Sequence, residues 1–223
     1  MADSKQSIEA VLRALPSLKG PFREAHIESL PNTPHEAFRL WFDDAISENI
    51  KEPHAMTLST VDEDGSPDAR VVILKNLDSR GWHFSINIGS AKGRQITANN
   101  RVAITFYWPQ LGRSVRLRGK AVMLSQEESS KSFLDRSIGA KTVAVASKQS
   151  QVLPGPDAMR DSLVEAQKVI EENPDYVLPS WKVYALDPQV VEFWQGSTDR
   201  LHQRLQYVRG EADGTWEKRN LWP

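Results

Sequence analysis

Short segments with alternating apolar and polar residues begin at Ala55, and they restrict the possible folds more than any other feature of the chain. An alternation of period two predicts strands, and connections of only a few residues make neighbouring strands antiparallel. Such strands are expected at residues 55–61, 69–74, 82–87, 102–108, 113–123, 181–186, 190–195, 205–209 and 215–221. We therefore expect a mainly β fold, an antiparallel barrel with flanking helices.

Helices are expected where a capping residue opens a segment with an apolar face. Thr33 and Glu36 form a capping box before a stripe of aromatic residues that is typical of a core-facing helix. Ser125 opens a second helix in the same way, and Ser90 stands at the start of a third. A fourth helix is expected at 157–172, where apolar residues recur at helical spacing.

The length and composition indicate one domain. We assign residues 33–223 to it and treat residues 1–32, which contain three prolines, as an N-terminal arm that is expected to be partly mobile. A net charge of −1 argues against a nucleic-acid partner. The chain has no cysteine, and its five histidines lack metal-ligand spacing, so no metal is expected. The chain has no long apolar run, so no membrane partner is expected and the protein is expected to be cytoplasmic.

Basic residues gather around one predicted hairpin and the helix that follows it. Arg70 and Lys75 stand on the hairpin, and Lys92 and Arg94 stand in the first turn of the helix. Fixed cations and free N–H groups at a helix start bind phosphate. The polar run at 149–151 could hydrogen-bond a heterocycle or a phosphate. The alternatives are cations that only reach solvent and a plain surface loop.

A second group of candidates lies near the C-terminus. Arg200, His202 and Arg204 alternate, so an extended segment would point all three to one side. Two guanidinium groups beside an imidazole can stabilise negative charge on a ring or hold a phosphate. Trp194 could stack on a planar cofactor. The alternatives are a solvated edge strand and a core tryptophan.

From about Phe38 to the C-terminus, the chain resembles the pyridoxamine 5′-phosphate oxidase family of FMN-binding split-barrel enzymes. The motifs that carry the resemblance occur in order: RVVILK (70–75), GSAKGRQI (89–96), FYWPQLGRSVRLRGK (106–120), SKQSQ (147–151), EFWQG (192–196) and RLHQRLQY (200–207). The resemblance implies oxidation of pyridoxamine or pyridoxine 5′-phosphate to pyridoxal 5′-phosphate. A hydride passes from the substrate C4′ to flavin N5, and O₂ then takes the electrons and yields hydrogen peroxide.

The resemblance also implies a set of site residues. FMN contacts are expected at Arg70, Val71, Val72, Ile73, Leu74, Lys75, Ser85, Ile86, Lys92, Ser114, Gln149, Ser150, Trp194 and Arg204. Lys75 and Arg136 are expected on the substrate phosphate, and Arg200 and His202 over the substrate ring as the catalytic pair. The family is a homodimer with each FMN between subunits. The contacts from 149–150, Trp194 and Arg204 are therefore expected to come from the partner chain.

The chain departs from the family pattern at five positions. Ala91 replaces an arginine, Ser114 a glutamine and Ile86 a threonine, while Ser132 and Ala140 replace a tyrosine and a serine that grip the substrate phosphate. Each lost hydroxyl removes a hydrogen bond worth about 1 kcal/mol. Two alternatives therefore stay open. One is an oxidase with another substrate, like the phenazine-biosynthesis oxidases, and the other is a non-catalytic protein that binds FMN or pyridoxal phosphate.

Overall fold

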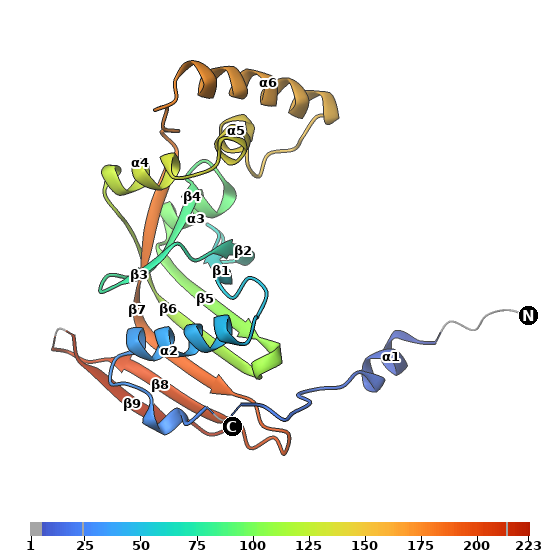
Figure 1. Ribbon diagram of the computed structural model, residues 1–223, viewed down its shortest axis with the longest axis vertical. Helices are drawn as coiled ribbons and strands as arrows, with labels where there is room; N and C mark the ends of the chain where they lie inside the picture. The colour runs from blue at the N-terminus through green and yellow to red at the C-terminus, as the bar shows by residue number, and fades with distance from the viewer. Residues whose placement is uncertain (1–5, 24, 213) are drawn as a thin grey trace, which may run out of the picture.

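The computed structural model describes residues 6–23, 25–212 and 214–223, which fold around one antiparallel sheet (Figure 1). The sheet order is β2-β1-β5-β6-β7-β4-β3, with β8 paired to β7 and β9 to β8. The strands are β1 (Ala55–Val61), β2 (Pro67–Ile73), β3 (Asn76–Asp78), β4 (Gly81–Asn87), β5 (Arg101–Trp108), β6 (Arg113–Met123), β7 (Trp181–Gln195), β8 (Gln203–Arg209) and β9 (Trp216–Asn220). The mainly β, antiparallel prediction is confirmed.

Strand β7 corrects one expectation, because the two segments expected at 181–186 and 190–195 form a single strand of 15 residues. Pro188 lies between the two expected segments, and β6 accommodates it with a register shift between Arg118 and Gly119. A Cβ on Gly119 would lie 2.0 Å from the Asp187 carbonyl oxygen, so glycine is required there. The first half of β7 pairs with β4 and the second half with β8.

The helices flank the sheet. They are α1 (Ile8–Ala14), α2 (Pro34–Ser47), α3 (Ala91–Ala98), α4 (Gln126–Leu134), α5 (Ile138–Ala146) and α6 (Pro156–Glu172), with the 3-10 turns η1 (Ile27–Ser29) and η2 (Pro109–Leu111). Thr33, Ser90 and Ser125 cap α2, α3 and α4 as expected. Helix α5 was not expected, because its small apolar residues show no clear amphipathic period.

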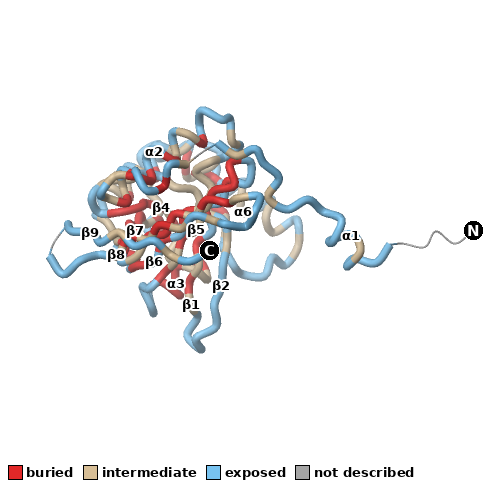
Figure 2. Tube along the Cα trace, turned by 90° about the horizontal axis from the view of Figure 1, so that it is seen from below, coloured by how far each residue is buried: buried red, intermediate tan, exposed pale blue. Residues whose placement is uncertain are grey.

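The core lies between α2 and the sheet. Phe38 of α2 is 4.8 Å from the Phe106 ring and 5.4 Å from the Trp82 ring, and Trp41 is 5.1 Å from Phe193, measured between ring centroids. Such edge-on and tilted aromatic pairs add stability beyond the area they bury. Figure 2 shows the buried part of the chain concentrated where α2 crosses the strands. Helix α2 therefore covers one face of the sheet, and the opposite face is the solvent-exposed one.

The segment before α2 joins this core. Ile27 and Leu30 are buried, and the Tyr207 hydroxyl donates a 2.7 Å hydrogen bond to the Pro31 carbonyl. The Lys218 ammonium group donates a 2.6 Å bond to the Leu30 carbonyl. In contrast, α1 has no buried residue and extends away from the sheet in Figure 1. Residues 27–31 are thus fixed to β8 and β9.

Candidate functional site

The N-terminus of α3 packs tightly against the end of β4. Ser90 caps the helix, its hydroxyl accepting from the Gly93 N–H at 3.3 Å. A Cβ on Gly93 would lie 2.4 Å from the Ile88 carbonyl oxygen, so only glycine lets this turn pack onto the end of β4. The helix start therefore presents N–H groups that favour negative charge.

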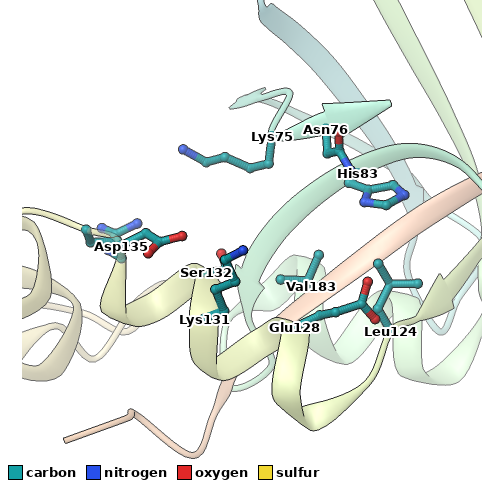
Figure 3. A pocket seen from close by; sticks show the side chains of 10 residues that line it. Lys75, Asn76, His83, Leu124, Glu128, Lys131, Ser132, Asp135 and Val183 are labelled. Carbon is teal, nitrogen blue, oxygen red and sulfur yellow. The ribbon is translucent and has the colours of Figure 1, made fainter. Parts of the chain in front are cut away.

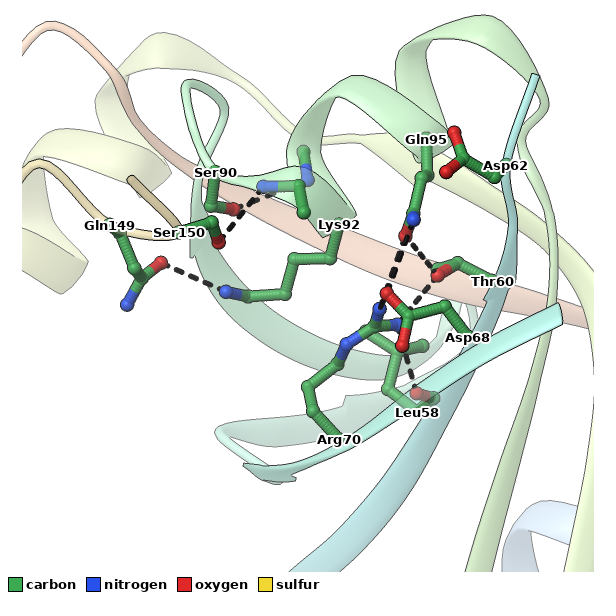
Figure 4. Close-up of polar contacts among 12 residues, drawn as sticks. Leu58, Thr60, Asp62, Asp68, Arg70, Ser90, Lys92, Gln95, Gln149 and Ser150 are labelled. Atoms are coloured by element: carbon green, nitrogen blue, oxygen red, sulfur yellow. Dashed lines mark hydrogen bonds and ion pairs between the residues drawn. The ribbon is translucent and has the colours of Figure 1, made fainter. Parts of the chain in front are cut away.

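Arg70 on β2 is held beside this helix by four groups (Figure 4). Its guanidinium donates to the Leu58 carbonyl at 3.2 Å, the Thr60 hydroxyl at 2.6 Å, and the Gln95 side-chain oxygen at 3.1 Å, and it pairs with Asp68. A guanidinium fixed in this way loses little conformational entropy when it binds an anion. Arg70 is therefore preorganised next to α3.

Lys92 is the second cation at this helix start. It is half-buried, and burial together with the nearby charge of Arg70 lowers the pKa of Lys92. Its ammonium group donates a 2.9 Å hydrogen bond to the Gln149 side-chain oxygen, and the Ala91 N–H donates to the Ser150 hydroxyl at 3.1 Å. Arg70 and Lys92 repel each other, and an anion bound between them at the helix N-terminus would relieve this repulsion.

Residues 149–150, which are expected to reach the site from a partner chain, also contact α3 of their own chain. Gln149 and Ser150 contact Lys92 and Ala91 of their own chain, because the loop after α5 folds back over α3. Ser150 has a φ of 71°, a left-handed turn conformation. This return of the chain was not expected, since α5 itself was not expected.

A cavity of about 470 Å³ lies between the β3–β4 hairpin and α4 (Figure 3). It is lined by Lys75, Asn76, His83, Leu124, Glu128, Lys131, Ser132, Asp135, Arg136 and Val183. The cavity brings together the two residues expected on one phosphate, although 60 residues separate them in sequence. It also includes Ser132, which stands at one of the positions that depart from the family.

Arg136 is positioned by an aromatic ring and a carbonyl group. Its guanidinium lies 4.3 Å from the centre of the Trp181 ring and donates to the Ala140 carbonyl at 3.1 Å. Its Nε is buried with no hydrogen-bond partner, and burial lowers the pKa of Arg136. A buried guanidinium with an unsatisfied N–H is stabilised when an anion binds.

Ser132 links this cavity to β4. Its hydroxyl shares a 3.0 Å hydrogen bond with the Ser85 hydroxyl and accepts from the Trp181 indole at 3.5 Å. Ser85, which the sequence assigns to FMN, is therefore next to the substrate candidates. Ile86 points into the core at 1% exposure, so only its backbone can contact a ligand, whereas Val71 is 69% exposed. Val72 and Leu74 pack partly against the core, and Ile73 ends β2.

A third group lines a groove of about 370 Å³ on the exposed face of the sheet. Ser114, Trp194 and Arg204 are cross-strand neighbours on β6, β7 and β8. Glu192 orients the cation, since its Oε1 accepts from Arg204 Nε at 3.0 Å. This groove lies at the β8 end of β7, and α3 lies at the β4 end (Figure 1). One chain therefore does not bring the two parts together.

Arg200 and His202 lie in the turn between β7 and β8, which contradicts the expected alternation with Arg204. Arg200 has a φ of 67°, so the segment is not extended. His202 Nδ1 accepts from the Ser197 N–H at 3.1 Å, and its ring lies 5.0 Å from Trp194. The hydroxyl of Ser197 and the Leu201 N–H lower the pKa of Asp199, which stabilises the turn. His202 thus borders the groove.

The sequence analysis also missed a pair of residues at the cavity. His83 Nε2 lies 3.0 Å from Asp78 Oδ1, across the two-residue turn that joins β3 to β4. Among residues 6–23, 25–212 and 214–223, no group of three or more metal-ligating side chains is found. No helix in the same residues is long and apolar enough to cross a bilayer.

Comparison with known proteins identifies the family. A family model described as pyridoxamine 5′-phosphate oxidase matches residues 42–170. The chain belongs to this family. A second model, described as the pyridoxine 5′-phosphate oxidase C-terminal dimerisation region, matches residues 181–223. The resemblance noted in the sequence is thus confirmed, and with it an FMN-dependent oxidoreductase of the split-barrel type.

Two curated relatives place the chain within the family, and two solved structures share its fold. The chain is 43% identical over 195 residues to a pyridoxine/pyridoxamine 5′-phosphate oxidase of Pseudomonas paraeruginosa, covering 86% of this chain and 90% of that one. A Legionella pneumophila protein of the same name is 38% identical over 213 residues, covering 95% and 98%. PhzG from Burkholderia lata, solved with tetrahydrophenazine-1-carboxylic acid, is 30% identical with a TM-score of 0.81, covering 93% and 100%. A Nostoc punctiforme FMN-binding protein shares the fold at 18% identity, with a TM-score of 0.69 and coverage of 86% and 98%.

Proposed function

We propose that the protein oxidises pyridoxamine or pyridoxine 5′-phosphate to pyridoxal 5′-phosphate, with FMN as cofactor and O₂ as electron acceptor. The observation that carries the proposal is the cavity in which Lys75 and Arg136 meet beside Ser85. A flexible ammonium group and a planar guanidinium together suit a phosphate monoester. The names of the curated relatives support the same substrate class.

The residues around α3 fit the phosphate end of FMN. Arg70 is held rigidly, Lys92 is half-buried, and the positive end of the helix dipole favours an anion between them. Gln149 and Ser150 complete this part from the same chain. Bound FMN supplies acceptance of a hydride at its ring and transfer of the electrons to O₂. The fit therefore rests on local positive charge in a chain of net charge −1.

A homodimer would complete the cofactor site. Ser114, Trp194 and Arg204 lie at the other end of β7 from α3, so a second copy is needed to bring such a groove to the helix. Val71, Tyr107 and Trp222 are exposed apolar residues, and residues 181–223 match a dimerisation region. Large exposed apolar side chains favour burial at an interface.

The role of the chain's own residues is to bind and orient the substrate. Lys75 and Arg136 would fix its phosphate, and Arg200 and His202 of a partner subunit would cover its ring. Holding a reactant in one orientation converts an encounter into an intramolecular step, which can lower the barrier by several kcal/mol. Positive charge from Arg200 would also stabilise negative charge on the ring.

The second candidate is oxidation of a dihydro-aromatic acid on the same scaffold. Ala140 has no hydroxyl group, and the shorter Ser132 hydroxyl is bonded to Ser85, so both positions lose part of the family's phosphate grip. The Ala140 backbone carbonyl accepts from Arg136. PhzG, whose structure holds a tetrahydrophenazine carboxylic acid, shares the fold over 93% of this chain. A carboxylate needs fewer donors than a phosphate, which is consistent with this alternative.

One assay separates these functions. The purified protein is expected to be yellow and, with pyridoxine 5′-phosphate in air, to form pyridoxal 5′-phosphate and hydrogen peroxide. Turnover only with a dihydro-aromatic acid would support the second candidate. A yellow protein without turnover would indicate a binding protein. Lys75→Met should weaken substrate binding, and Lys168→Met on the exposed face of α6 is the matched control.

A further inference from the structure

Gln195, the last residue of β7, is only 7% exposed, and both ends of its side-chain amide are hydrogen-bonded. Its Nε2 donates to the Leu111 carbonyl at 3.0 Å and to the Gly196 carbonyl at 3.2 Å. Its Oε1 accepts from Arg113 Nε at 2.9 Å. Gln195 belongs to the EFWQG motif, but the functions assigned so far make no use of it.

Arg113 determines which way the Gln195 amide faces. The Arg113 side chain is 1% exposed, lies 4.7 Å from the centre of the Trp41 ring, and pairs with Asp44 of α2 at 2.8 Å. A guanidinium has only donors, so the Gln195 oxygen must face Arg113 and the Gln195 nitrogen must face the backbone carbonyls. The orientation of the amide is therefore set by a buried cation that is fixed to α2.

The turn between β7 and β8 begins at this amide. The Gly196 N–H donates to the Gly112 carbonyl at 2.7 Å, which joins the residue after Gln195 to the end of η2. Ser197 comes next, and it is bonded to both candidate catalytic residues. Its N–H donates to His202 Nδ1 at 3.1 Å, and its carbonyl accepts from the Arg200 N–H at 3.2 Å. A single residue thus separates Gln195 from the one that orients Arg200 and His202.

We propose that Gln195 is a positioning residue for the reaction: its amide, oriented by Arg113, fixes the start of the β7–β8 turn and thereby holds Arg200 and His202 in place over the substrate. The inference rests on the proposed function, which places these two residues over the substrate ring. A displacement of about 1 Å in an active site can reduce the rate about a hundredfold. A bond that only stabilised the fold would leave kcat/KM unchanged when it is removed.

The first variant is Gln195→Glu. A glutamate keeps an acceptor for Arg113 but has no N–H for the carbonyls of Leu111 and Gly196. We expect kcat/KM for pyridoxine 5′-phosphate to fall at least tenfold. The dissociation constant of FMN should stay within about twofold, because side chains alternate along β7 and Gln195 faces away from the groove at Trp194.

Tyr207→Phe is the matched control. It also removes a buried side-chain donor from a backbone carbonyl, that of Pro31, but it does so within β8 and not at the turn. The two variants should lose stability to a similar degree, which urea denaturation measures. Tyr207→Phe is expected to keep the kcat/KM of the wild type.

A second measurement does not depend on turnover. Amide hydrogen exchange of the FMN-loaded protein, followed by mass spectrometry, reports the opening of residues 196–202. Exchange there should be at least tenfold faster in Gln195→Glu and unchanged in Tyr207→Phe. Arg113→Lys keeps a positive charge near Asp44 but loses the planar fork that also bonds to Gln195, so it should show a smaller change in the same direction. If Gln195→Glu did not fold, Arg113→Lys would give the same two measurements.

The failure of this inference can be told apart from the failure of the proposed function. Equal kcat/KM in Gln195→Glu and Tyr207→Phe would show that Gln195 only stabilises the fold, and would overturn the inference. Unchanged exchange at 196–202 in Gln195→Glu would overturn it as well. In contrast, a wild type that does not oxidise pyridoxine 5′-phosphate would overturn the proposed function. Faster exchange at 196–202 in Gln195→Glu would still support the anchoring of the turn in that case.

Discussion

Lys92 and Gln149, which are 57 positions apart, are joined by a 2.9 Å hydrogen bond between the ammonium group and the side-chain oxygen. The bond connects the first turn of α3 to the loop after α5. It holds a half-buried cation whose pKa is lowered by burial and by Arg70. The energetic cost of keeping two cations close together is recovered when an anion binds between them.

The first prediction concerns Lys92→Met. Loss of this charge should weaken FMN binding about tenfold or more, because a hydrogen bond to a charged group contributes about 1.5–3 kcal/mol. Quenching of flavin fluorescence on titration of the apoprotein measures the dissociation constant. Arg94→Met, on the same helix but bonded to the Gly89 carbonyl, is the control. Equal weakening in both variants would contradict a specific role for Lys92.

The second prediction restores the family's phosphate grip. Ser132→Tyr replaces a short hydroxyl with one that reaches further into the cavity, and Ala140→Ser adds a hydroxyl near Arg136. Each should lower KM for pyridoxine 5′-phosphate by about twofold to tenfold. The 470 Å³ cavity beside Ser132 has room for part of the larger ring. Steady-state kinetics gives the values, with Ser130→Tyr, on α4 but outside the cavity lining, as the control. An increased KM in both variants would favour a substrate other than a phosphate ester.

The third prediction concerns Arg200→Ala. The residue lies in a turn rather than in β8, so its removal should leave the sheet and the bound FMN intact. Turnover should fall, because the positive charge over the substrate ring is lost. Absorbance of bound flavin and kcat/KM measured on the same preparation separate the two effects. Unchanged kinetics would remove Arg200 from the active site.

The fourth prediction concerns His35, whose ring stacks 4.8 Å from Trp82 and whose Nε2 is buried without a partner. Burial lowers the pKa of His35 below its usual value of 6.5. The unfolded chain therefore binds more protons as pH falls below about 6.5, and the folded state loses stability in that range. His35→Phe should raise the free energy of unfolding by about 1 kcal/mol or more at pH 5, and by less at pH 8.

Urea denaturation at both pH values tests this prediction. The variant should be more stable than the wild type, and by more at pH 5 than at pH 8. A phenylalanine has no proton to gain, so the variant's stability should vary less with pH. A variant that loses stability equally at pH 5 and pH 8 would show that packing against Trp82, and not protonation, controls this position. His54→Phe, in the loop before β1, serves as the comparison.

Local sequence patterns predicted most of the fold. Strands β1, β5 and β6 follow the expected boundaries within one residue, because one face of each is buried and the other exposed. Strand β7 was divided at Pro188, since tolerance of a proline depends on a glycine in the neighbouring strand. Helix α5 escaped prediction because its residues are nearly all small and apolar. Both errors concern features set by tertiary neighbours.

The candidate site was predicted unevenly for a related reason. Lys75 and Arg136 were paired only through the family resemblance, and no spacing in the sequence brings α4 against the β3–β4 hairpin. The alternation of Arg200, His202 and Arg204 was misleading, since a left-handed residue at position 200 cannot be read from an arginine. His83 was missed because a histidine in a strand is more often a simple core residue.

Strand β7 carries a consequence for how the protein acquires activity. Its 15 residues form one continuous strand, and its two halves pair with different neighbours, β4 and β8. The cationic start of α3 and the groove at Trp194 lie at opposite ends of this strand, so one chain cannot bring them together. In the proposed homodimer each chain supplies one part of each cofactor site, so dilution that separates paired subunits should release the flavin and abolish activity in the same step.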